Sequence, residues 1–224
     1  MRDADVRRAL LEQLRAEHSP ADTLIVEELG LCQGSTRVDV AVINGELSGY
    51  EIKSASDTLV RFPRQQQLYS QILDRAWIVA CDERLQELEA TLPSWWGMIA
   101  IVSATTDGLE LCVRRESSVN PCIDAAALAE LLWRDEALAL LSSRGVDRGV
   151  RTKGRRELWA RVLEVYSLAE LRDAVRAAIK ARSTWRTGRR PSRGGAKYPD
   201  GARFLGSLVS SDQPRTEQCT DRRD

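Results

Sequence analysis

Residues 37–54, RVDVAVINGELSGYEIKS, leave little choice of secondary structure because apolar and polar side chains alternate on both sides of an Asn-Gly pair. A period of two predicts β-strands, and the Asn-Gly pair predicts the turn between them. Side chains two residues apart share a face of a strand, so Glu51 and Lys53 point together while Ile52 points into the core. The stretch therefore predicts a β-hairpin that carries Asp39, Glu51 and Lys53 at its edges.

Two carboxylates beside a lysine suggest a particular chemistry. Carboxylate oxygens are suitable ligands for Mg²⁺, and a metal ion together with a lysine can stabilise the charge that develops when a phosphodiester is attacked. This pattern indicates a metal-dependent nuclease, or the descendant of one. The alternative is that these acids are ordinary solvated charges on a hairpin.

The turn must satisfy a geometric condition if the two acids are to act together. Asp39 shares a face with Glu51 only when paired residue numbers add to an even value, as in 39 opposite 51. A two-residue turn at Asn44-Gly45 would pair 43 with 46 and would put the acids on opposite faces. We therefore predict a three-residue turn or a bulge over residues 44–46.

The flanking segments predict alternating helices and strands. Helical spacing of apolar residues predicts helices over 2–18, 62–71 and 83–91. Apolar runs predict strands over 23–29, 38–43, 47–54, 76–81, 97–104 and 109–114, the last two joined by a turn at 106–108. The resulting order of helix, three strands, helix and strand predicts an α/β (α+β) fold, with a mixed central sheet flanked by helices.

Beyond Asp124 the sequence is expected to be helical, and its charge changes. Residues 1–143 carry a net charge of −10, whereas residues 144–195 carry +10, although the whole chain is neutral. Helices are expected to Gly145 and over 155–166 and 168–182, with a disordered tail from 184. A basic block in an acidic protein is a candidate nucleic-acid interface. Solvated helix faces are the alternative explanation.

The composition excludes several classes of site. A single histidine, His18, leaves too few imidazoles for a catalytic triad, an HExxH zinc site or a facial triad. Five scattered cysteines without a CxxC pair argue against a disulfide framework or a zinc ribbon. No run approaches the roughly 20 apolar residues of a membrane span. The charged N-terminus MRDADVRRAL is unlike a signal sequence, so we expect a cytoplasmic protein without a membrane partner.

The predicted order of elements, with Asp39 on the second strand and Glu51-x-Lys53 on the third, resembles the PD-(D/E)XK nuclease superfamily. This restriction-endonuclease-like fold has an αβββαβ core. Val38 stands where the superfamily's name has proline, a departure that its members commonly show. The resemblance implies that Asp39, Glu51 and the carbonyl of Ile52 bind Mg²⁺, for which Mn²⁺ can substitute. It also implies that Lys53 orients or activates the attacking water.

A second element, in the helix after the third strand, matches the RecB-like branch of the superfamily. Gln65 and Tyr69 form a Q-x-x-x-Y pair, and a spacing of four puts both on one helix face. The resemblance implies that this pair acts near the metal, where it positions phosphate or a metal-bound water. The superfamily often adds another acid to the metal site, and the candidates are Glu28, which we favour, Asp5 and Glu12.

The similarity is closer still to a group of small bacterial proteins of that superfamily. Shared features are the charged opening at 2–7, the GYEIKS strand, Asp-Thr-Leu at 57–59 and the pair Trp95-Trp96. This resemblance runs from residue 1 to about residue 183. Residues 131–168 also loosely resemble a SAP-like helical module, which implies contact with the DNA backbone.

Together these patterns predict three regions: a nuclease-like domain at 1–122, a basic helical appendage at 123–183 and a polar tail at 184–224. Candidate phosphate contacts are Arg61, Arg64, Arg151, Lys153, Arg155 and Arg156. Four tryptophans are expected to anchor the core, with base stacking as the alternative: Trp95, Trp96, Trp133 and Trp159.

The leading hypothesis is a Mg²⁺-dependent DNA nuclease, which acts alone, as a homodimer or with a partner protein. The alternative is a non-catalytic nucleic-acid-binding or complex-forming protein on the same fold.

Overall fold

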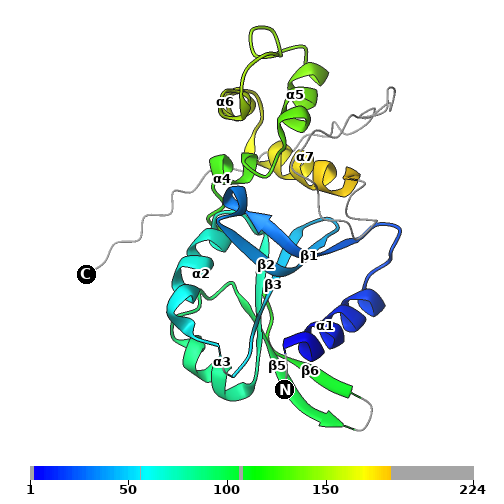
Figure 1. Ribbon diagram of the computed structural model, residues 1–224, viewed down its shortest axis with the longest axis vertical. Coiled ribbons are helices and arrows are strands. Elements are labelled where there is room, and N and C mark those ends of the chain that lie inside the picture. Colours follow the sequence, from blue (N-terminus) through cyan, green and yellow to red (C-terminus); the bar gives the residue numbers. More distant parts are fainter. Residues whose placement is uncertain (1–2, 56, 106–107, 183–224) are drawn as a thin grey trace, which may run out of the picture. The chain divides into compact units, whose positions relative to one another are not determined.

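A mixed six-stranded sheet forms the centre of the computed structural model, which describes residues 3–55, 57–105 and 108–182 (Figure 1). The strands lie side by side in chain order, β1-β2-β3-β4-β5-β6. Pairing is antiparallel from β1 to β3, parallel from β3 to β5, and antiparallel between β5 and β6. The bounds are β1 Leu24–Leu31, β2 Thr36–Ile43, β3 Leu47–Lys53, β4 Arg75–Ala80, β5 Gly97–Thr105 and β6 Gly108–Arg115. The predicted mixed sheet of an α+β fold is thus confirmed.

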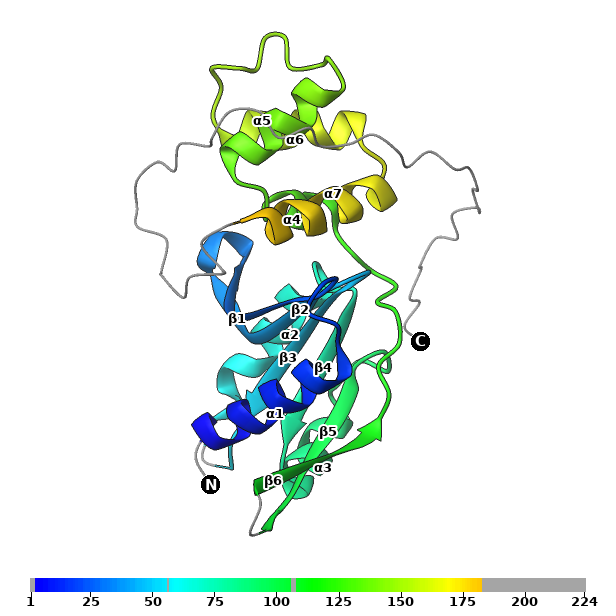
Figure 2. The same ribbon diagram turned by 90° about the vertical axis from the view of Figure 1, so that its right-hand side faces the viewer.

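Helices cover both faces of this sheet (Figures 1 and 2). Helix α1 (Asp3–Glu17) packs its buried Val6, Leu10 and Leu14 on one face, as the apolar spacing of the segment predicts. Helices α2 (Phe62–Ser70) and α3 (Asp82–Glu89) pack on the opposite face. Strand β4 is covered on both sides, which explains why its sequence is almost continuously apolar. None of the described helices is both long and apolar enough to cross a membrane.

The turn between β2 and β3 has the predicted length of three residues. Val40 pairs with Tyr50 and Ile43 with Leu47, so Asn44, Gly45 and Glu46 form the connection. The turn is closed by two contacts of 3.1 Å, in which the Asn44 N–H donates to the Glu46 carbonyl and the Glu46 N–H donates to Asn44 Oδ1. This register places Asp39 across from Glu51, as a shared site requires. In the other predicted turn, residues 106–107 lie outside the described part of the chain.

Four helices follow the sheet: α4 (Ala125–Ala129), α5 (Arg134–Ser143), α6 (Arg155–Val165) and α7 (Leu168–Ala181). The segment from Asp124 to Gly145 is helical as predicted but divides in two, because Glu136 caps a new helix by accepting the Trp133 N–H at 2.7 Å. Trp95, Trp96 and Trp159 are core residues, and Trp133 is half-buried beneath the guanidinium of Arg182.

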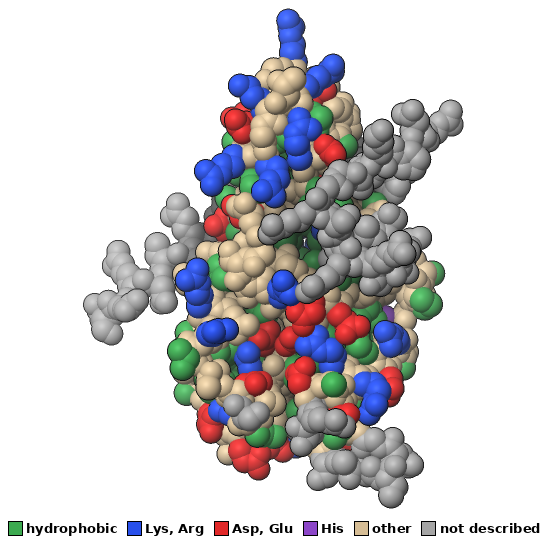
Figure 3. Space-filling view, in the orientation of Figure 1, with side chains coloured by type: hydrophobic (Ala, Val, Ile, Leu, Met, Phe, Trp, Pro, Cys, Tyr) green, Lys and Arg blue, Asp and Glu red, His purple; other side chains and the backbone are tan. Residues whose placement is uncertain are grey.

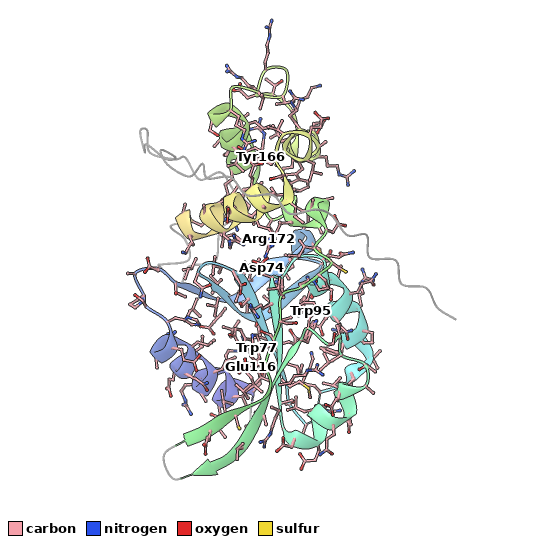
Figure 4. All side chains as sticks on the ribbon, turned by 180° about the vertical axis from the view of Figure 1, so that it is seen from behind. Asp74, Trp77, Trp95, Glu116, Tyr166 and Arg172 are labelled. Carbon is pink, nitrogen blue, oxygen red and sulfur yellow. The ribbon has the colours of Figure 1, made fainter. Side chains whose placement is uncertain are left out.

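The buried carboxylate of Asp74 joins these helices to the sheet (Figure 4). It accepts the Leu47 N–H at 2.7 Å, Arg172 Nε at 2.7 Å and Arg176 Nη1 at 3.0 Å, so it connects β3 directly to α7. The described residues belong to one compact unit. The proposed boundary at residue 122 stays a prediction, and the predicted tail at 184–224 lies outside the described residues.

Candidate active site

Glu51 lies at the centre of the candidate site, with its carboxylate buried against α2. Its Oε1 accepts hydrogen bonds from Lys53 Nζ at 2.6 Å and from Gln65 Nε2 at 3.0 Å. Its Oε2 accepts one from the Tyr69 hydroxyl at 2.6 Å. Gln65 also uses its Oε1 to accept from Lys53 Nζ at 3.1 Å. The structure therefore brings the predicted Glu51, Lys53, Gln65 and Tyr69 into one network.

Asp39 lies where β2 separates from β3, beyond the last backbone pair between these strands. Its Oδ2 accepts the N–H of Ile52 at 2.8 Å, so the carboxylate takes the place of a backbone partner. The N–H and C=O of one strand residue face the same neighbouring strand. The Ile52 carbonyl therefore faces the side on which Asp39 lies, as the predicted ligand set requires.

Burial gives the two carboxylates unusual proton affinities. Burial, and then the negative charge of Asp39, raise the pKa of Glu51 to about 7, although Lys53 and Tyr69 act in the opposite direction. Burial also raises the pKa of Asp39, against the stabilising Ile52 N–H and Arg7 guanidinium. For both acids, burial therefore outweighs the hydrogen-bond donors and positive charges that surround the carboxylate.

The Tyr69 hydroxyl lies within hydrogen-bond distance of two acceptors, Glu51 Oε2 on β3 and the carbonyl of Arg37 on β2. Burial and the nearby Glu51 also raise the pKa of Tyr69, which keeps this hydroxyl protonated.

The donor set fits Mg²⁺ better than a metal that needs a complete protein cage. Within residues 3–55, 57–105 and 108–182, no group of three or more histidine, cysteine or acidic side chains is arranged to hold a metal ion. Mg²⁺ usually binds through one or two carboxylates and keeps several waters. Asp39, Glu51 and the Ile52 carbonyl supply such a set of oxygen ligands.

Of the three candidates for an additional acid, only Glu28 is placed beside Asp39. It lies across from Asp39 in β1, where it adopts a left-handed φ of 54°. Its Oε1 forms an ion pair of 3.1 Å with Arg7, and its side chain is half-exposed. Asp5 instead pairs with Arg8 at 3.5 Å, and Glu12 is exposed on α1.

Arg7 is the main site residue that the sequence did not reveal. Its guanidinium donates to Asp39 Oδ1 and to the Asp39 carbonyl, both at 2.9 Å, and also pairs with Asp3 at 3.4 Å. The only available signal was the spacing of four between Asp3 and Arg7 on a helix. That spacing could not show which helix face would meet β2, nor distinguish Arg7 from Arg8.

Comparison with known proteins places this chain in a family. The sequence model of the family described as Bacteriophage P4 protein cII matches residues 1–189. The chain belongs to the phage P4 cII family. Protein cII of Enterobacteria phage P4 is 26% identical over 186 residues, which cover 81% of this chain and 68% of that protein.

Two solved structures show weaker likeness. The SPO1766 protein of unknown function from Silicibacter pomeroyi has a TM-score of 0.39 and 22% identity, covering 66% of this chain and 95% of that one. Pyrococcus furiosus SfsA in complex with Ca²⁺ has a TM-score of 0.27 and 18% identity, covering 50% of this chain and 59% of that one.

The span that matches the cII family includes both sets of predicted phosphate contacts. Arg61 and Arg64 are exposed at the start of α2, and neither forms an ion pair within the described part of the chain. A second set lies on the connection between α5 and α6 and on the first turn of α6, where Lys and Arg side chains gather at one end of the view (Figure 3). Its predicted members, all exposed, are Arg151, Lys153, Arg155 and Arg156.

The second set is distant from the Glu51 network. The α5–α6 connection lies at the opposite end of the described unit from α1 and α3 (Figures 1 and 2). Arg151 is partly neutralised by Asp147 at 2.7 Å, and Arg155 lies over the ring of Trp159. These residues could hold nucleic acid, but they do not line the candidate active site.

Proposed function

We propose that this member of the cII family is a Mg²⁺-dependent nuclease of the PD-(D/E)XK type, which hydrolyses phosphodiester bonds in DNA. The observation that carries the proposal is the contact of Glu51 with three side chains, those of Lys53, Gln65 and Tyr69. A hairpin with solvated charges would not bury such a network. Mn²⁺ is expected to substitute for Mg²⁺.

The residues of the site would have separate roles in such a reaction. Asp39, Glu51 and the Ile52 carbonyl would hold the ion, which supplies Lewis-acid stabilisation and a water of lowered pKa when bound. Lys53 Nζ lies 2.6 Å from Glu51 Oε1, and only 11% of the Lys53 side chain is exposed. From there it can orient the attacking water and contact the scissile phosphate.

Gln65 and Tyr69 act as positioning residues. Gln65 holds Lys53 with its carbonyl oxygen and Glu51 with its amide nitrogen, so the lysine and the carboxylate keep a fixed separation. Tyr69 connects Glu51 to the backbone of Arg37 on β2, the strand that carries Asp39. The pair on α2 therefore fixes two metal-binding strands relative to each other.

Substrate binding is assigned to two exposed basic regions. Arg61 lies one turn before Gln65 on the same helical side, so Arg61 and Arg64 are suited to phosphates that approach the site. The α5–α6 connection would bind the DNA backbone farther from the Glu51 network. Contacts of this kind give an affinity that depends on salt and little on sequence.

A second candidate function is favoured by the Arg7–Asp39 pair. Because Arg7 already satisfies Asp39 Oδ1 at 2.9 Å, the fold can neutralise this acid without a metal. A nucleic-acid-binding or complex-forming protein without turnover could keep the same network. For both functions, we propose that the protein acts as a homodimer or with a partner protein.

The two functions can be separated by cleavage assays on purified protein. Supercoiled, linear and single-stranded DNA are incubated with wild type, Lys53→Ala and Lys180→Ala, in Mg²⁺, Mn²⁺ or EDTA. A nuclease predicts metal-dependent cutting that Lys53→Ala loses while it still binds DNA. Lys180→Ala is the matched control, since Lys180 donates to the Asp22 carbonyl and belongs neither to the Glu51 network nor to the proposed DNA contacts, so cutting should be unchanged.

Binding without cutting by the wild type, in any metal, would support the non-catalytic function instead. Equal cutting by wild type and Lys53→Ala would show that the observed activity does not arise at this site.

A further inference from the structure

Val60 is the most exposed large apolar residue in the described part of the chain. It is 87% exposed, against 49% for Val119, which comes next. Val60 lies in a 3₁₀ turn, Leu59–Arg61, that leads directly into α2. An apolar side chain stabilises a fold by leaving water, so a valine this exposed adds almost nothing to the stability of the chain. Single exposed apolar residues are common on protein surfaces, and the surroundings of Val60 must therefore show whether it has another role.

The turn that carries Val60 adjoins the Glu51 network. Phe62, which begins α2, is buried, and the centre of its ring lies 5.7 Å from Lys53 Nζ. Gln65, in the first turns of the same helix, donates to Glu51 Oε1 at 3.0 Å. Val60 is therefore exposed on the same short segment as side chains of the candidate active site.

Two kinds of side chain share the outer surface of this segment. Residues three apart lie on the same side of a 3₁₀ turn and are neighbours on the surface of an α-helix. Val60 and Pro63, both exposed, therefore form an apolar ridge. Arg61 and Arg64, also exposed, form a basic stripe beside it. Neither arginine has an ion-pair partner among the described residues, so both are available to phosphates.

The connection that precedes the ridge is held in place by the fold. Arg84 on α3 donates to the backbone carbonyls of Ala55 at 2.6 Å and of Asp57 at 3.2 Å. The Asp57 carboxylate accepts the N–H of Ser54 at 2.8 Å, and the Asp57 N–H donates to the Ser54 carbonyl at 3.2 Å. A segment that is already fixed loses less conformational entropy when it binds a ligand, so the ridge is suited to make contacts in one orientation.

We propose that the ridge of Val60 and Pro63 is a wedge that inserts between neighbouring bases of DNA, while Arg61 and Arg64 hold nearby phosphates. The inference rests on the DNA substrate of the proposed function, and it specifies the form in which that DNA is bound: a duplex unstacked beside the scissile phosphate. Apolar side chains inserted between base steps unstack and kink DNA in this way. An apolar ridge beside two unpaired arginines complements a polyanion with apolar bases, which favours DNA over a protein as its partner.

2-Aminopurine in the DNA reports this insertion directly, because its fluorescence rises when the base loses its stacked neighbours. Full-length protein is titrated into a short duplex that carries 2-aminopurine in place of its adenines, in EDTA to prevent metal-dependent cutting. Binding by wild type is expected to raise the fluorescence. Val60→Ser should lose this rise and bind the duplex about tenfold more weakly, the size expected when one stacking contact is lost.

A duplex with a run of mismatches separates a wedge from an ordinary contact, since its bases are already partly unstacked. Val60→Ser should bind this DNA nearly as tightly as wild type does, whereas Arg61→Ala should weaken the binding of both DNAs by the same factor. Val60→Ile keeps a β-branched apolar side chain and should behave like wild type with both.

Val119→Ser is the matched control, because Val119 is also an exposed valine but lies between β6 and α4, outside the Glu51 network. It should leave the fluorescence rise and both affinities unchanged. Substitutions at exposed positions rarely change stability by much, and circular dichroism checks that each variant is folded.

Three results would contradict the inference, and they have different meanings. Unchanged fluorescence when wild type binds the duplex, or an equal rise with Val60→Ser, would refute the wedge, leave the nuclease proposal intact and indicate a protein partner for the ridge. Equal weakening of both DNAs by Val60→Ser would make Val60 an ordinary surface contact. Binding of neither DNA by wild type would also refute the wedge, and the cleavage assay in Mg²⁺ then decides separately whether the proposed function holds.

Discussion

Glu51→Gln should stabilise the protein in EDTA at alkaline pH, although it removes a proposed metal ligand. A glutamine resembles the protonated form of Glu51: its amide oxygen can accept from Lys53 and Gln65, and its amide nitrogen can donate to Tyr69. All the contacts of the buried carboxyl can therefore be kept. What the variant loses is the burial of a negative charge.

The size of the effect follows from the pKa of Glu51, which burial raises from 4.5 to about 7. A folded-state pKa above the unfolded value means that protonation favours the fold. The contribution is complete below pH 4.5 and is lost as the pH rises through 7. At 1.36 kcal/mol per pKa unit, the loss is roughly 3 kcal/mol. Glutamine does not ionise, so the variant does not lose this stability.

Urea unfolding in EDTA at pH 4.0 and pH 8.5 measures this difference. We expect the variant and the wild type to have nearly equal free energies of unfolding at pH 4.0, and the variant to be more stable by roughly 3 kcal/mol at pH 8.5. Excess Mg²⁺ should raise the stability of the wild type alone. A variant that is no more stable than wild type at pH 8.5 in EDTA would refute the reasoning.

Three further predictions concern the surroundings of the site. Asp74→Asn should lower the free energy of unfolding by about 3–5 kcal/mol, because it leaves Arg172 and Arg176 without their buried carboxylate, whereas exposed Asp173→Asn should change it little in the same urea titration. Tyr69→Phe should weaken Mn²⁺ binding by about 10–100-fold, because it removes a hydroxyl that orients the Glu51 carboxylate. An unchanged Mn²⁺ titration would contradict the positioning role of Tyr69. Arg64→Ala should remove about one phosphate contact and so lower the slope of log K for DNA binding against log salt by about one. An unchanged slope would place Arg64 outside the interface.

The sequence could predict those parts of the fold and site that depend on local spacing. Period-two alternation located β2 and β3, and the requirement that Asp39 face Glu51 gave the length of the turn at 44–46. A spacing of four on one helix correctly placed Gln65 and Tyr69 on the side that meets Glu51. Each of these inferences depends on the geometry of one or two neighbouring elements.

Contacts between distant segments could not be predicted in this way. Arg7 and Asp39 are 32 residues apart, and Arg172 and Asp74 are 98 residues apart. Nothing in the periodicity of α1 or α7 identifies a carboxylate on another element as the partner of its arginine. Such pairs depend on the docking of whole elements, so only the tertiary structure reveals them.

Tertiary contacts also change what the basic block at residues 144–195 implies about nucleic-acid binding. A net charge of +10 over residues 144–195 suggests a long interface, yet much of that charge is used inside the fold. Its internally paired cations are Arg144 with Glu170, Arg151 with Asp147, Arg161 with Glu164, Arg172 and Arg176 with Asp74, and Arg182 with Glu136. An ion pair neutralises much of the field that a phosphate would feel. Among the described residues of the block, the cations with neither an ion pair nor a backbone acceptor are Arg148, Lys153, Arg155 and Arg156, all exposed around the α5–α6 connection. The block is therefore best regarded as two populations, one that holds the C-terminal helices together and a smaller one available to bind a polyanion.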